Sequence, residues 1–212
     1  MRKFFLLIIA AVCLVSCQKE ISDYINDDNS NGGNNGEDST AVNPLKGLWN
    51  FTSISANTQN SSELNYLGED DKTISFTNYT SENNSGTLVV DDSIFSMNDH
   101  TYSISTTLKT YSYQNGVLLD SMDVPFNYYM PATNSTAKYK LIGNDSVYFP
   151  EGGFLSTASD SSAFKPYGLK FKIAGTVLTF TQNISLDTVV TASGVSQHET
   201  STGTGTISFL GK

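Results

Sequence analysis

The sequence predicts an all-β protein, and two features of residues 45–212 carry that prediction. Apolar and polar residues alternate with period two, as in strands that bury one face. Charged residues make up only 16% of the chain and aromatic residues 11%, which suits strands with one apolar and one hydroxyl-rich face. The alternation is clearest in GLKFKIAGTVLTFTQNI, where the apolar faces of two successive strands carry Leu169, Phe171 and Ile173, then Leu178, Phe180 and Ile184.

The first 16 residues are predicted to be an export signal. Arg2 and Lys3 precede an apolar run from Phe4 to Val15, which is too short to span a bilayer as a helix. The residues LVSC, 14–17, resemble the bacterial lipoprotein box. That resemblance implies cleavage before Cys17, lipidation of Cys17 with palmitate-type acyl chains, and a lipid-anchored protein of the outer membrane, on its periplasmic face or at the cell surface.

Residues 17–44 are predicted to be a lipidated, flexible linker rich in Asn, Gly and Asp, because they contain few apolar groups to bury. Within it, DDNSNGGNNGED (27–38) matches part of a calcium-loop template. The template requires flanking helices and a bidentate glutamate at its last position, whereas Asp38 stands there. We therefore interpret residues 27–38 as a tether.

Residues 45–212 are predicted to form one domain of about eight to ten strands. Turn signals occur at Asn115-Gly116, at Gly143-Asn144-Asp145 and at residues 83–86. Consecutive hairpins close most simply into an antiparallel up-and-down β-barrel, which removes exposed edges; a β-sandwich is the alternative. Two longer stretches, 56–72 and 150–168, are predicted to be irregular loops at a rim.

The opening of this domain, Gly47-Leu48-Trp49, resembles the G-x-W motif of lipocalin-like families. The runs KYKLIGNDSVYF (138–149) and LKFKIAGTVLTFTQ (169–182) look like the hairpins of short lipocalin-like domain lipoproteins of the Bacteroidota, and this resemblance extends to residues 45–212. This resemblance implies a calycin-type barrel with Trp49 across its closed end. The central T-D-Y motif of lipocalins is absent, and Lys212 stands near the place of the usual arginine.

A barrel of this size either encloses a small-molecule cavity or is filled by its own side chains. The candidate cavity-lining residues lie on single strand faces and are Trp49, Phe51, Val124, Phe126, Tyr128 and Met130. The predicted function is binding of a small apolar or amphipathic ligand. The alternative is a filled barrel or sandwich that presents its loops to a glycan, an envelope protein or a transporter.

Charge and residue content argue against other function classes. Without Arg2 and Lys3 the chain keeps 10 basic against 21 acidic residues, so nucleic acid would be repelled. His100 and His198 are predicted to be ordinary surface residues, and no triad is expected because adjacent strand residues point to opposite faces. We expect no enzymatic activity, no cofactor and no metal site; the carboxylates at 69–71 and 91–92 are interpreted as solvated loop charges.

Overall fold

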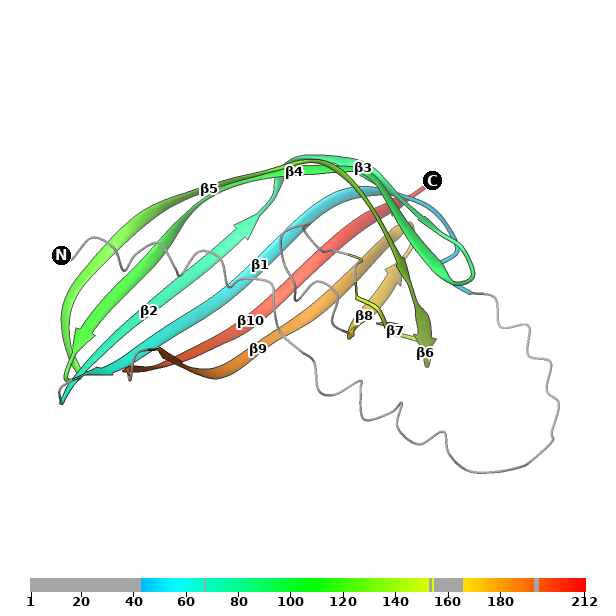
Figure 1. Ribbon diagram of the computed structural model, residues 1–212. Helices are drawn as coiled ribbons and strands as arrows, with labels where there is room; N and C mark the ends of the chain where they lie inside the picture. Colours follow the sequence, from blue (N-terminus) through cyan, green and yellow to red (C-terminus); the bar gives the residue numbers. More distant parts are fainter. Residues whose placement is uncertain (1–42, 67, 153, 155–165, 193–194) are drawn as a thin grey trace, which may run out of the picture.

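The computed structural model describes residues 43–66, 68–152, 154, 166–192 and 195–212, and there it contains ten antiparallel strands (Figure 1). This confirms the predicted all-β class and strand number. The hydrogen-bonded order is β2-β4-β3-β1-β10-β9-β8-β7-β6, with β5 on the outer side of β4. The strands are β1 (Gly47–Tyr66), β2 (Glu69–Thr80), β3 (Glu82–Val90), β4 (Ile94–Gln114), β5 (Val117–Lys138), β6 (Lys140–Ile142), β7 (Ser146–Phe149), β8 (Tyr167–Ala174), β9 (Val177–Ala192) and β10 (Val195–Gly211).

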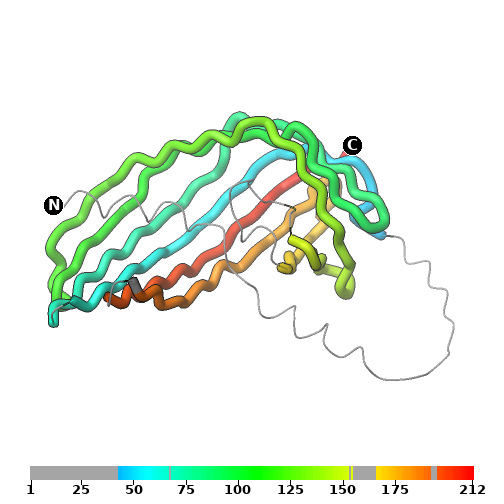
Figure 2. Tube along the Cα trace, viewed as in Figure 1, coloured from blue at the N-terminus to red at the C-terminus, as the bar shows by residue number. Residues whose placement is uncertain are grey.

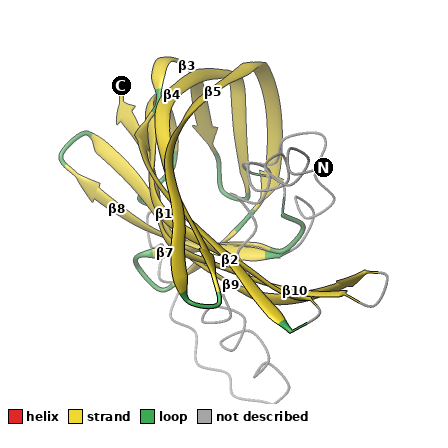
Figure 3. Ribbon diagram, turned by 90° about the vertical axis from the view of Figure 1, so that its left-hand side faces the viewer, coloured by secondary structure: helices red, strands yellow, loops and turns green. Residues whose placement is uncertain are grey.

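The sheet is long and strongly curved, and its two ends differ (Figures 1 and 2). We call the end that carries β3, β6, β7 and β8 the proximal end. At the other, distal end only six long strands continue side by side, in the order β5-β4-β2-β1-β10-β9. Viewed from the side, the sheet curls over on itself at the proximal end (Figure 3). No helix in the described part of the chain is long and apolar enough to cross a membrane.

Strands β2 and β3 together occupy one place in the sheet, between β1 and β4. The break between them is at Ser81, whose N–H donates to the Ile54 carbonyl over 2.7 Å, while the Ile54 N–H donates to the Ser81 hydroxyl over 2.8 Å. The predicted hairpin turn at residues 83–86 is therefore wrong. The positive φ angles of Asn83 and Gly86 serve irregularities within β3.

The predicted loop at residues 56–72 is also wrong, because β1 runs through Tyr66 and β2 begins at Glu69. Its Ser, Thr and Asn residues are paired on both sides; Asn60, for example, lies opposite Ser201 on one neighbour and Ser75 on the other. Flanking strands satisfy the backbone and outweigh the turn preference of these residues. The hairpin turns at Asn115-Gly116 and Gly143 are confirmed, with positive φ where the turn requires it.

The hydrophobic core lies at the proximal end and is mainly aromatic. Phe95 is fully buried, and its ring packs edge-on against Phe149 and Phe154 at centroid distances of 5.3 and 4.9 Å. Trp49 lies in the same core and donates its indole N–H to the Leu45 carbonyl over 2.8 Å. This bond satisfies the one polar atom of a buried tryptophan.

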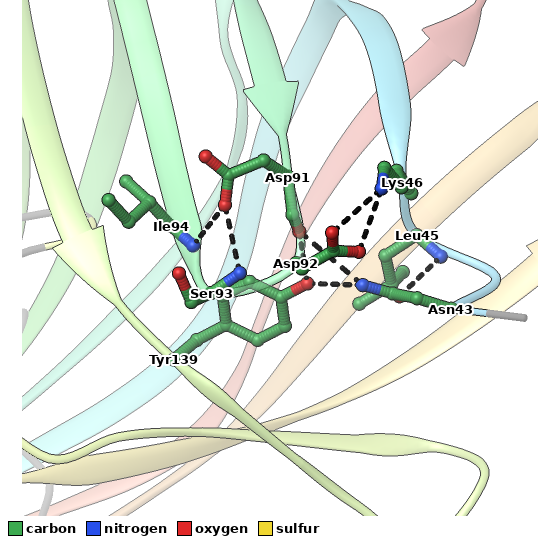
Figure 4. Close-up of polar contacts among 8 residues, drawn as sticks. All are labelled: Asn43, Leu45, Lys46, Asp91, Asp92, Ser93, Ile94 and Tyr139. Carbon is green, nitrogen blue, oxygen red and sulfur yellow. Dashed lines mark hydrogen bonds and ion pairs between the residues drawn. The ribbon is translucent and has the colours of Figure 1, made fainter. Parts of the chain in front are cut away.

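Polar contacts fasten the start of the described chain to this end (Figure 4). We call Asn43, Asp91 and Tyr139 the proximal latch. The Asn43 amide donates to the Tyr139 hydroxyl over 2.5 Å, and that hydroxyl donates to the Asp91 carbonyl over 2.7 Å. The Asp91 carboxylate accepts the N–H groups of Ser93 and Ile94, which holds its pKa below the ordinary value. The latch joins the entry of β1 to the β3–β4 turn and to the single residue between β5 and β6.

Candidate ligand site at His100

A β-bulge in β4 turns the side chain of His100 toward the inside of the sheet. Phe95 and Met97 are buried at odd positions, whereas Tyr102 and Ile104 are buried at even positions. The pairing of β4 with β5 shifts on both sides of His100, and Asp99 has a φ of 50°. One extra residue at Asn98-Asp99 thus changes which parity faces inward, and His100 joins the buried face.

The neighbouring strands are adapted to this bulge. Gly86 of β3 has a φ of 129°, and a Cβ added there would lie 2.9 Å from the His100 Cα, so only glycine fits. On the other side, the Asp99 N–H donates to the Asn134 side chain over 2.7 Å. Strained backbone of this kind persists where the surrounding structure enforces it, often at functional sites.

The His100 imidazole is nine-tenths buried, with 6% of its surface exposed. Its ring stands edge-on to Phe51 at 4.5 Å and lies 5.3 Å from the ring of Tyr102. Within the described residues its Nε2 has no hydrogen-bond partner. Burial lowers the pKa of His100 to about 4, because the charged form loses its hydration. The side chain is therefore a neutral imidazole at pH 7.

His100 lines a cavity of about 80 Å³ that lies between the aromatic core and the distal part of the sheet. An apolar cavity of about 150 Å³ is known to bind benzene, so this space takes only part of such a ring. Apolar side chains supply most of the wall, and none of the lining residues in the described chain is Asp, Glu, Lys or Arg. The main apolar contributors are Ile54, Met130, Phe154, Leu169, Phe180 and Ile207.

Some of the other polar side chains of the wall have partners within the protein. Thr133 donates to the His100 carbonyl and Ser135 to the Phe154 carbonyl, each over 3.4 Å. Tyr79 also has an interaction partner. Among the described residues that line this cavity, Nε2 of His100 is the buried side-chain atom without one. It is therefore a point at which the wall can bind a polar group.

Of the six residues predicted to line a cavity, Met130 lines the one beside His100, and the other five lie in or beside the core or farther along β5. Met130 is held by a hydrogen bond from the Tyr128 hydroxyl to its sulfur over 3.3 Å. Trp49 and Phe51 are buried in the aromatic core, and Phe126 and Tyr128 pack against that core while half-buried. Val124 lies farther along the same face of β5 and is half-buried.

The surface assignment of His100 is wrong, because the bulge places its side chain on the buried face of β4. The sequence contains a signal for the bulge: apolar residues fall on odd positions up to Met97 and on even positions from Tyr102. His198 is partly exposed, as predicted, and its Nε2 lies 2.8 Å from the Asp187 carboxylate.

Tyr102 is buried, whereas Tyr111 and Tyr113 lie on the opposite face of β4. The acidic residues at 69–71 and 91–92 include several that make structural contacts. Asp92 pairs with Lys46 at 2.8 Å, and Asp70 bonds to the Asn115 turn through its backbone. The described residues contain no group of three metal-ligating side chains placed to hold an ion.

Several predicted features lie outside the described residues: Cys17, the signal peptide at 1–16, the calcium-like segment at 27–38 and most of the loop at 150–168. Of the predicted linker at 17–44, only Asn43 and Pro44 are described.

Comparisons with known proteins add little. No family model matches the chain, and no curated protein matches it. Among solved structures, the translocator domain of the autotransporter NalP from Neisseria meningitidis aligns over 88% of this chain and 92% of its own, with 9% identity and a TM-score of 0.24. At that score the similarity carries no argument about fold or function.

Proposed function

We propose that this protein binds a small apolar or amphipathic molecule inside a lipocalin-like β-barrel, and that a lipid on Cys17 anchors it to the outer membrane. The observation that carries the ligand-binding part is the cavity beside His100, whose described lining residues are mainly apolar and include no Asp, Glu, Lys or Arg. Ligand sites typically combine such walls with a few polar groups that fix orientation. The lipid anchor rests on the sequence of residues 1–17 alone.

The strand pairing supports a barrel as the fold type. Strand β5 pairs with β4, and after Tyr139 the chain continues as β6, which pairs with β7. If β2 and β3 count as one strand and β5 and β6 as another, eight strands follow in chain order, and β10 pairs back with β1. That is the order of an up-and-down barrel with eight strands.

The cavity volume limits the ligand. The space beside His100 holds the end of a small molecule, and the remainder of that molecule would lie over the inner face of the distal sheet. We expect that binding of toluene or benzyl alcohol to the purified domain shifts the NMR signals of the Met130 and Ile207 methyl groups. Ala56→Leu, which fills the cavity from β1, should abolish the shifts. Unperturbed methyl groups at saturating probe concentrations would contradict ligand binding here.

An interaction module is the second candidate, and the distal end favours it. The tip of β5 exposes three consecutive apolar residues, Val117, Leu118 and Leu119, and β9 exposes Val189 and Val190. Acidic residues dominate around them. In the described chain, the distal part of the sheet carries only two lysines, Lys72 and Lys109. It carries eight acidic residues: Glu63, Glu69, Asp70, Asp71, Asp120, Asp123, Asp187 and Glu199.

An apolar tip with an acidic surround suits a protein partner whose apolar patch is edged by Lys or Arg, and it disfavours anionic lipid. A photo-crosslinking residue at position 118 should then capture such a partner in cells, with loss of the crosslink in Asp120→Asn/Asp123→Asn. The control carries the photo-crosslinking residue in place of Val177, near the proximal end. Equal capture at both positions would count against a distal docking surface.

A further inference from the structure

We propose that His100 determines which ligands enter the cavity, and that it selects uncharged molecules bearing a hydroxyl group next to a small apolar body. This inference rests on the proposed ligand-binding function and specifies its ligand class. The hydroxyl would hydrogen-bond to Nε2 of His100, and the apolar body would contact Met130, Phe180 and Ile207.

The first step of the argument is that the fold is adapted to place this one imidazole. Three features keep His100 turned inward: the bulge with a left-handed Asp99, the glycine at 86 that no other residue can replace, and the hydrogen bond that the Asp99 N–H donates to the Asn134 side chain. Regular alternation would instead have left His100 on the outer face. A buried histidine without a hydrogen-bond partner destabilises the fold by itself. A bound ligand that supplies the missing hydrogen bond would explain why the fold keeps His100 in this position.

The second step concerns the hydrogen-bonding group. In a neutral imidazole one ring nitrogen donates and the other accepts, and which one does so depends on the tautomer. A hydroxyl group both donates and accepts, so it satisfies Nε2 in either tautomer. A carbonyl can only accept and would require the proton on Nε2. Alcohols and phenols therefore fit the site most generally.

The third step concerns charge. The described residues that line the cavity include no ionised side chain, so a buried carboxylate or ammonium group would lose its hydration without gaining a counter-ion. His100 is neutral and cannot supply that counter-ion. The wall should thus reject charged analogues that have the same size and shape as a neutral ligand.

Four probes that share a phenyl ring with one attached carbon separate these steps: benzyl alcohol, toluene, benzoate and benzylammonium. Binding to the native domain at pH 7.5 is measured by the NMR shifts of the Met130 methyl group. We expect benzyl alcohol to bind about tenfold more tightly than toluene, as one hydrogen bond to a buried group allows, and both charged probes to bind at least about 100-fold more weakly than benzyl alcohol.

Two variants assign the preference to His100. His100→Phe keeps a ring against Phe51 and should bind both neutral probes with equal affinity. His100→Gln retains a side chain that donates and accepts, and it should restore part of the preference. A native preference that persists in His100→Phe would overturn the role of His100.

The outcomes also distinguish this inference from the proposed function. Equal binding of toluene and benzyl alcohol to the native domain would refute selection by His100 and leave ligand binding intact. Binding of benzoate or benzylammonium as tight as that of benzyl alcohol would refute the exclusion of charge. Failure of all four probes to shift the Met130 signal would refute the proposed function itself.

Discussion

Acidification should destabilise the fold through His100 before most carboxylates become protonated. The pKa of His100 is lowered by burial to about 4, whereas an unfolded histidine has a pKa near 6.5. Between these values the unfolded chain binds more protons than the folded one, so stability falls as pH falls through this window. The full difference of about 2.5 units corresponds to roughly 3 kcal/mol at 1.36 kcal/mol per unit.

The contribution can be measured at pH 5.0, where an ordinary aspartate or glutamate is still largely ionised. There His100 should account for a loss of about 2 kcal/mol relative to pH 7.5. Urea unfolding followed by the fluorescence of Trp49 gives the free energy of unfolding at each pH. We expect His100→Phe to lack this part of the loss. An identical pH dependence in the native protein and in His100→Phe would refute the assignment of a buried, neutral imidazole.

Three further substitutions test the packing. Gly203→Ala should lower the free energy of unfolding by about 1–3 kcal/mol or more, because a Cβ there would lie 2.2 Å from the Asn57 carbonyl oxygen. Gly205→Ala on the same strand is the control, since its Cβ would meet nothing within 4 Å. Equal unfolding midpoints of the two variants would contradict the clash. Tyr139→Phe should cost about 1–3 kcal/mol in urea unfolding, because it removes the hydroxyl group of the proximal latch; an unchanged midpoint would show that the latch does not stabilise the fold. Lys46→Ala should change stability by less than about 1 kcal/mol, because its ion pair is solvent-exposed, and a larger loss would contradict that assessment.

Period-two alternation predicted the strand content well, because burial of one face imposes it directly on the sequence. Asn115-Gly116 was predictable for a similar reason, since its backbone angles suit few other residue pairs. The strand at residues 56–66 was missed because its residues are small and polar. It pairs with β2 on one side and with β10 on the other, and the pairing with β10 joins residues far apart in the chain, which leaves no local pattern.

The candidate site was predicted only in part. Met130 belongs to it, and the face of β5 that carries Met130 was recognised from alternation. Trp49 and Phe51 are apolar residues of the same interior, and sequence alone does not distinguish a filled core from the wall of a cavity. His100 was missed because a single bulge reverses the parity of β4. The change from odd to even apolar positions between Met97 and Tyr102 was the available signal.

The most direct test of ligand selection by His100 is an NMR measurement on the histidine itself. With ¹⁵N-labelled histidine in the native domain at pH 7.5, saturating benzyl alcohol should shift the Nε2 resonance of His100, and toluene should shift it much less. Both probes should show intermolecular contacts to the Met130 methyl group. An Nε2 resonance that does not respond to benzyl alcohol, although the probe contacts Met130, would contradict the account.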